Sequence, residues 1–235
     1  MPNPLEALAF YVIFLFSTVL HEGAHAFVAM RGGDKTAYHG GQVSLNPIPH
    51  IKRSPFGMVV APLLSLYLTH TMIGWGAAPY NPRWASRYPT RYALMSLAGP
   101  STNLLLSVLG FVLLLTLAKA GVLSLAHPSL LDLDSIAVPP GEATNTPAAA
   151  LARVLSVLFS LNLLLAIFNL LPVPPLDGAS VLEGFFPKRV GALMNKVREQ
   201  PILGLLGLIL VWRVIGYLFM PAWSALVGLL YTAYF

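Results

Sequence analysis

The chain has 235 residues, of which 56% are hydrophobic and only 10% are charged; its formal net charge is +5, and it has no cysteine. Soluble domains carry about 25% charged residues, so the composition excludes an ordinary soluble enzyme, a disordered chain and a disulfide-stapled secreted domain. The missing cysteines exclude thiolate metal sites and thiol nucleophiles.

The apolar stretches of the chain indicate a membrane protein, because about 20 apolar residues are enough for a helix that crosses a bilayer. The last stretch is long enough for one tilted helix, or for two short helices broken at Pro221. A further apolar stretch, Phe56–Ala78, contains glycines and a proline and is ambiguous. Clear membrane-spanning helices are expected over Leu5–Met30, Tyr92–Ala118, Leu151–Leu171 and Pro201–Phe235.

The charges of the connecting segments predict the topology. Segments 31–54, 79–91 and 178–200 are net positive, whereas segment 119–147 is net negative. The positive-inside rule therefore places the first three in the cytoplasm and the fourth outside. Residues 56–78 would then begin and end on the same side, which predicts a re-entrant or interfacial segment buried in protein or lining a cavity. A plain fifth spanning helix is the alternative.

The strongest chemical signal is His21-Glu22-Gly23-Ala24-His25, in the first apolar stretch. Histidines at positions i and i+4 share one helix face, so both imidazoles can bind one zinc ion, and the intervening glutamate can act as a general base. A pair of packing histidines is the alternative. Ionisable residues inside a membrane are costly, however, and usually indicate a function.

A catalytic zinc needs a third protein ligand and one open position. Asp34 is close to the histidines in sequence but lies in a basic loop. Asp177 follows the third long stretch, which is expected to end on the cytoplasmic side at the depth of the histidines. Prolines end that helix, and Gly178 permits a tight turn. Asp177 is therefore the candidate ligand; an aspartate that caps a membrane-exit turn is the alternative.

Three motifs in this order resemble the site-2 protease family of intramembrane zinc metalloproteases. They are HEGAH in the first long helix, AGPSTN at residues 98–103, and NLLPVPPLDG at residues 169–178. Segments 40–50 and 74–79 are similar to the compact bacterial branch without PDZ or CBS domains. The resemblance implies a single catalytic Zn²⁺ bound by His21, His25 and Asp177, with Glu22 as catalytic base and proton shuttle and Asn169 lining the site.

A short strand is expected near this site, because Val43 and Leu45 alternate with polar residues over 41–46. A transmembrane substrate must unwind before it can be cut, and an edge strand could bind its freed backbone by strand addition. A purely structural hairpin is equally compatible with this weak alternation.

These observations predict an all-α polytopic membrane protein with about five to six transmembrane helices, a re-entrant or interfacial segment and a short β-hairpin or strand near the active site. We expect a single membrane-embedded domain over residues 1–235, with a catalytic core over about 5–185 and a C-terminal helix or helical hairpin over 201–235.

The predicted function is that of an intramembrane zinc metalloendopeptidase. It would cut single-pass membrane proteins in or near their transmembrane segments, within the lipid bilayer and without a nucleic-acid partner. We expect it in a bacterial cytoplasmic membrane, with its active site toward the cytoplasm. The alternatives are a metalloprotease with a glutamate as third ligand, whose ExxxD pattern is not found after HEGAH, and a zinc-binding transporter or scaffold without turnover.

Overall fold

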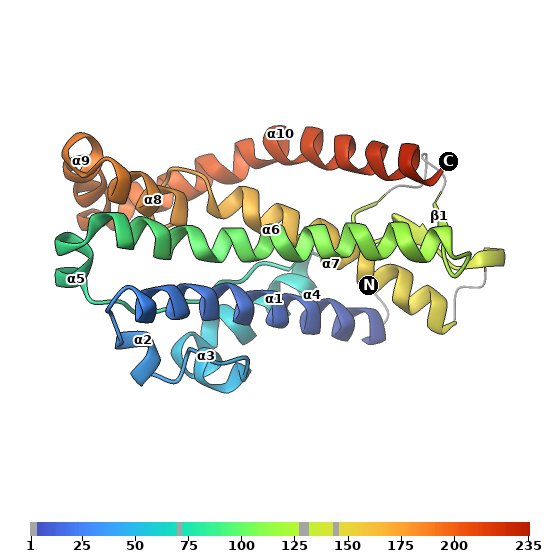
Figure 1. The fold of residues 1–235 in the computed structure, drawn as a ribbon, viewed down its shortest axis with the longest axis horizontal. Helices are drawn as coiled ribbons and strands as arrows, with labels where there is room; N and C mark the ends of the chain where they lie inside the picture. The colour runs from blue at the N-terminus through green and yellow to red at the C-terminus, as the bar shows by residue number, and fades with distance from the viewer. Residues whose placement is uncertain (1–3, 70–71, 127–131, 143–145) are drawn as a thin grey trace.

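The structure is a computed structural model that describes residues 4–69, 72–126, 132–142 and 146–235. Most of its long helices run side by side along the longest axis of the molecule (Figure 1). The elements are α1 (Pro4–Arg31), α2 (Thr36–His39), α3 (Pro47–Arg53), the π-helix η1 (Phe56–Val60), α4 (Ala61–Thr69), α5 (Pro82–Arg87), α6 (Pro89–Lys119), β1 (Ser124–Leu125), β2 (Ala137–Val138), the 3₁₀ turn η3 (Pro140–Glu142), α7 (Pro147–Asn169), α8 (Asp177–Phe185), α9 (Pro187–Glu199) and α10 (Pro201–Tyr234).

Four helices of the described chain are long and apolar enough to cross a membrane, which confirms the all-α polytopic class. They lie within α1, α6, α7 and α10, so the number of complete spans in this part of the chain is four, below the five to six expected. The C-terminal stretch is one helix, because α10 continues through Pro221. A further apolar helix, Phe56–Leu68, is too short to span a bilayer.

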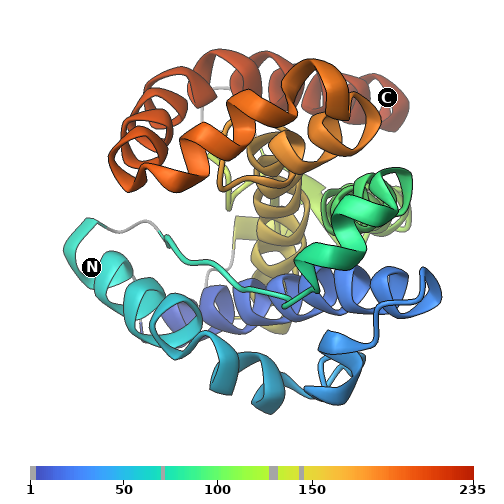
Figure 2. The ribbon, with the colours of Figure 1, turned by 90° about the vertical axis from the view of Figure 1, so that its left-hand side faces the viewer.

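The apolar helical segment over residues 56–69 is followed by residues 72–81, which run back beside it. After η1 and α4 the chain returns as an extended segment over residues 72–81 (Figure 2). The Trp75 amide donates to the Gly57 carbonyl at 3.0 Å, and the Ile73 amide donates to Ser65 Oγ at 2.9 Å. Two glycines allow this close return, since a Cβ at Gly74 would lie 2.5 Å from the Gly57 carbonyl oxygen.

Residues 41–46 form turns, so the strand predicted there is wrong. Gly41 has a positive φ of 76°, which suits a turn. The Asn46 side chain then accepts a hydrogen bond from the Ile48 amide and caps α3, with Pro47 at the first helical position. The small antiparallel sheet of the described chain pairs β1 with β2, between α6 and α7, at the end of the molecule away from α2, α5 and α9 (Figure 1).

The main hydrophobic core joins α6, α7 and α10 in the half of the molecule that contains the sheet. A Cβ at Gly110 of α6 would lie 2.8 Å from the Phe159 backbone nitrogen of α7, so glycine is needed for this close helix packing. Trp223 of α10 donates to Ser160 Oγ of α7 at 2.9 Å. The buried core residues are Leu114, Leu123, Ile136, Ala137, Ala152, Leu155, Phe159, Leu163, Phe219, Trp223, Val227 and Leu230.

Candidate metal centre

His21 and His25 lie one turn apart on α1 and face α6 and α8, as their spacing predicts. Both are buried, with 7% and 5% of their surfaces exposed. Their ring centroids are 4.6 Å apart in an edge-to-face arrangement. The two imidazoles therefore present neighbouring nitrogens to the same buried space.

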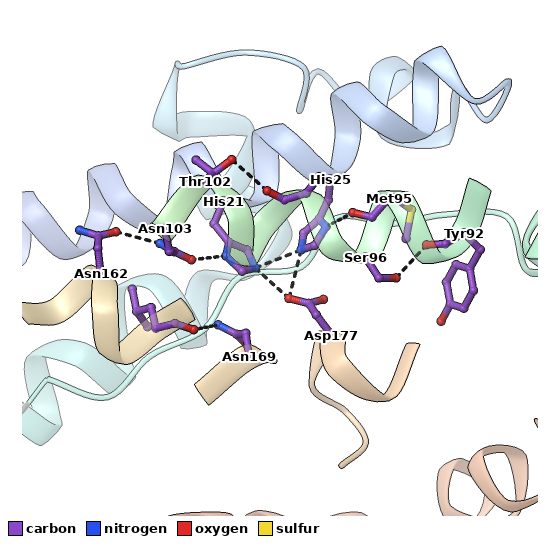
Figure 3. A network of polar contacts seen from close by, with 12 residues as sticks. His21, His25, Tyr92, Met95, Ser96, Thr102, Asn103, Asn162, Asn169 and Asp177 are labelled. Carbon is purple, nitrogen blue, oxygen red and sulfur yellow. Dashed lines mark hydrogen bonds and ion pairs between the residues drawn. The ribbon is translucent and has the colours of Figure 1, made fainter. Parts of the chain in front are cut away.

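Asp177, the first residue of α8, brings a carboxylate to these imidazoles (Figure 3). Its Oδ2 lies 3.1 Å from His21 Nε2 and 3.3 Å from His25 Nε2, and the two Nε2 atoms are 3.0 Å apart. Gly178 allows the chain to turn here, because a Cβ at this position would collide with the Leu170 carbonyl. The N-cap residue of α8 is Leu176 and not Asp177, so the place of the Asp177 side chain beside the histidines agrees with the ligand interpretation and not with that of a cap.

The triangle of two Nε2 atoms and one Oδ2 atom fits a zinc ion. A tetrahedral zinc with ligands at about 2.0–2.1 Å holds those ligands about 3.3 Å apart, close to the separations observed here. His21, His25 and Asp177 are the one group of metal-binding residue types that comes together in this way within the described residues.

The other ring nitrogen of each histidine is also engaged. His21 Nδ1 lies 2.5 Å from Asn103 Oδ1, and His25 Nδ1 lies 2.7 Å from the Met95 carbonyl oxygen, both on α6. A carbonyl oxygen can only accept, so each Nδ1 carries a proton, and in a neutral ring the free electron pair is then on Nε2. Metal-binding histidines usually have such outer partners.

Gly99 lies between these two contacts on α6, directly against the histidines. A Cβ there would be 2.5 Å from His21 Nε2 and closer still to His25 Nε2. The position therefore requires a residue without a side chain.

Replacing Gly99 by Ala is expected to weaken zinc binding about tenfold or more, because overpacking costs about 1–3 kcal/mol and about 1.4 kcal/mol corresponds to a factor of ten. Competition with a chelator in detergent solution measures this affinity. Gly110→Ala is the matched control, since its methyl group also collides with a neighbour but on α7, where it touches none of the three ligands. Equal zinc affinity in Gly99→Ala and the wild type would contradict this account of Gly99.

Glu22 is buried next to the pair, with 6% of its surface exposed. Its carboxylate packs against the extended segment at Gly76, where a Cβ would lie 2.6 Å from Glu22 Oε1. The same segment is held by Gln42, whose Nε2 donates to the Ala77 carbonyl at 2.9 Å. The glutamate thus lies between the histidine-bearing helix face and a stretch of extended backbone.

Two other residues considered from the sequence are bound elsewhere. Asn169 donates through Nδ2 to the Leu165 carbonyl of its own helix at 3.0 Å, so its predicted role in the site stays a prediction. Asp34 is buried and accepts from the Thr36 hydroxyl at 2.5 Å and from the Asn81 amide at 2.7 Å. Asp34 anchors one end of the extended segment and does not join the triangle.

The sequence did not indicate the full set of residues around the histidines. The Met95 carbonyl carries no side-chain signal. Asn162 of α7, which bonds to Asn103, was overlooked, although an amide in an apolar membrane helix is costly to bury and could have been noticed for that reason. In the sequence, Asn103 stands out only as the last residue of the AGPSTN motif.

The chain was compared with known proteins. The model of peptidase family M50 matches residues 9–212. "Putative zinc metalloprotease YwhC" of Bacillus subtilis (strain 168) is 34% identical over 198 residues, which are 83% of this chain and 78% of that protein. "Putative zinc metalloprotease Rip2" of Mycobacterium tuberculosis (strain H37Rv) is 31% identical over 207 residues, 88% of this chain and 68% of that protein. The Rip2 of Mycolicibacterium smegmatis is 29% identical over 77% of this chain and 60% of its own length. No solved structure matches significantly.

Proposed function

The chain belongs to peptidase family M50, and we propose that it is an intramembrane zinc endopeptidase that cuts membrane proteins in or near their transmembrane segments. The observation that carries this proposal is the triangle formed by His21, His25 and Asp177, whose ligand atoms lie 3.0–3.3 Å apart. The ligands come from α1 and α8, and His21 and Asp177 are 156 residues apart in sequence, so their convergence is a property of the folded chain.

Three residues would bind the metal, and a fourth acts as the general base. His21, His25 and Asp177 would hold the zinc ion, and their three donor atoms leave the fourth position open. When bound, zinc supplies Lewis-acid chemistry, because it lowers the pKa of water toward neutrality and polarises a carbonyl group. Glu22 is the general base, which accepts a proton from the attacking water and passes it to the leaving amine.

The extended segment 72–81 is the proposed docking strand for the substrate, in place of residues 41–46. A helical substrate offers no free amide to attack, so it must unwind, and its freed backbone groups then need partners. Segment 72–81 supports this role because it is in neither a helix nor a strand, runs as an extended trace (Figure 2) and contacts Glu22 at Gly76. Strand addition along it would place a substrate's backbone beside the catalytic base.

The membrane orientation is also part of the proposal. Its four apolar helices and its family make the chain an integral membrane protein. Helices α2, α5 and α9, which belong to the basic segments, gather at one end of the molecule (Figure 1). The positive-inside rule would place that end in the cytoplasm, with the metal centre toward it, in a bacterial cytoplasmic membrane.

Removing the metal from the purified protein tests the proposal. Treatment with a zinc chelator is expected to abolish cleavage of a model single-pass substrate in detergent, and added zinc, but not magnesium, to restore it, because nitrogen ligands suit zinc and magnesium prefers oxygen. Full cleavage by zinc-depleted protein would contradict the proposal. Tight zinc binding without cleavage of any transmembrane substrate would instead favour the transporter or scaffold alternative.

A further inference from the structure

A buried series of hydrogen-bonded polar side chains, the polar relay, extends from His21 away from the metal centre and joins three membrane helices (Figure 3). His21 of α1 bonds to Asn103 of α6, whose Nδ2 donates to Asn162 Oδ1 of α7 at 2.8 Å. Asn162 Nδ2 in turn contacts Ser17 Oγ of α1 at 2.9 Å and donates to the Leu158 carbonyl at 2.9 Å. Asn103, Asn162 and Ser17 are each fully buried.

The far end of the polar relay fixes the direction of every hydrogen bond in it. The Leu158 carbonyl can only accept, so the Asn162 amide nitrogen must face it and Asn162 Oδ1 must face Asn103. The amide nitrogen of Asn103 then faces Asn162, and its Oδ1 is left to face His21. As a result His21 carries a proton on Nδ1, and the neutral ring then directs the free electron pair of Nε2 toward the triangle.

We infer that Asn103 is a positioning residue of the zinc centre, which holds His21 in its metal-binding tautomer, and that Asn162 and Ser17 hold Asn103 in turn. This inference rests on the proposed zinc site and deepens it. His25 needs no such relay, because the Met95 carbonyl accepts its Nδ1 proton directly. The asparagine of the AGPSTN motif therefore serves the metal centre in addition to helix packing.

The first test compares the zinc affinities of Asn103 variants of the full chain in detergent. Asn103→Leu keeps the size of the side chain but leaves the His21 Nδ1 proton without an acceptor. We expect it to weaken zinc binding about 10–100-fold, the usual cost of losing an outer partner. Asn103→Asp retains an acceptor toward His21 Nδ1, and as a neutral carboxylic acid it also keeps a donor toward Asn162 Oδ1. This variant is expected to bind zinc within about threefold of the wild type.

Ser107→Ala is the matched control, because Ser107 lies one turn further along α6 and donates to the Phe159 carbonyl of α7 at 3.0 Å, away from the ligands. It removes a buried bond between the same two helices and should leave zinc affinity unchanged. Wild-type affinity in Asn103→Leu, or equal weakening in Asn103→Leu and Asn103→Asp, would overturn the inference.

A second measurement reads the wild-type protein itself. In zinc-loaded protein labelled with ¹⁵N-histidine, His21, assigned with a His21→Ala sample, should show a hydrogen-bonded Nδ1 proton that exchanges slowly with water. A rapidly exchanging Nδ1 proton, or zinc bound through Nδ1, would overturn the inference. Neither readout depends on cleavage, so a wild-type protein that fails to bind zinc would refute the proposed function, whereas zinc binding that ignores Asn103 refutes only the relay.

Discussion

Glu22→Gln is expected to lower the rate of cleavage by about 10²–10⁴-fold, the range contributed by a positioned general acid or base. Glutamine keeps the length of the side chain, and therefore its packing against Gly76, but it cannot accept a proton. Zinc content should stay at the wild-type value because Glu22 is not a member of the triangle. The measurement is cleavage of a model transmembrane substrate by purified protein, together with metal analysis of the same sample.

Cleavage and zinc content are measured on the same sample because together they distinguish the loss of a base from the loss of the metal. A protein that retains zinc and loses turnover identifies a base next to an intact centre. Wild-type turnover in Glu22→Gln would show that another group carries the proton, and the assignment of Glu22 would be wrong.

Asp177→Ala is expected to weaken zinc binding strongly. The loss of an outer partner of a ligand costs about 10–100-fold in affinity, and the loss of a ligand itself should cost more. The change removes one of three protein ligands and leaves two imidazoles on a single helix. Cleavage should be lost with the metal. Zinc affinity and zinc content of the purified variant measure the effect.

Asp34→Asn provides the matched control for this experiment. Asp34 is close to the histidines in sequence and is buried, with 5% of its surface exposed. It bonds to Thr36 and Asn81 and lies outside the triangle. Wild-type zinc affinity in Asp34→Asn is therefore expected, and the same affinity in Asp177→Ala would mean that another group completes the site.

The apolar stretches and the histidine pair could be predicted from the sequence because both depend on local patterns. The stretch predicted over Leu5–Met30 corresponds to α1 at Pro4–Arg31, and Tyr92–Ala118 to α6 at Pro89–Lys119. The turn after the third apolar stretch drew attention to Asp177, since prolines and a glycine restrict the backbone in recognisable ways.

A proline inside an apolar stretch does not by itself end a membrane helix in this chain. Pro100 lies inside α6 and Pro221 inside α10, and neither ends its helix. A proline removes one backbone hydrogen bond, but in membrane helices neighbouring groups can satisfy the carbonyl that is freed. The sequence therefore left open whether residues 201–235 form one helix or two.

The docking strand and the polar relay could not be predicted because both depend on contacts between distant segments. The weak alternation of apolar and polar residues favoured a strand over residues 41–46. The segment that lies against Glu22 contains Gly74 and Gly76 and shows no such alternation, so the sequence did not indicate it. Asn103 and Asn162 are 59 residues apart, and they meet only when α6 packs on α7. Hydropathy reports that a helix is apolar but not which of its few polar groups meet.

The most direct test of the account is zinc X-ray absorption spectroscopy on the purified wild-type protein in detergent. A zinc ion held by His21, His25 and Asp177 should show a first shell of about four nitrogen and oxygen atoms at about 2.0–2.1 Å. Scattering from the more distant ring atoms should correspond to two imidazoles. A first shell with three or more imidazoles, or one made of water without imidazole, would contradict the claim that these three side chains hold the metal.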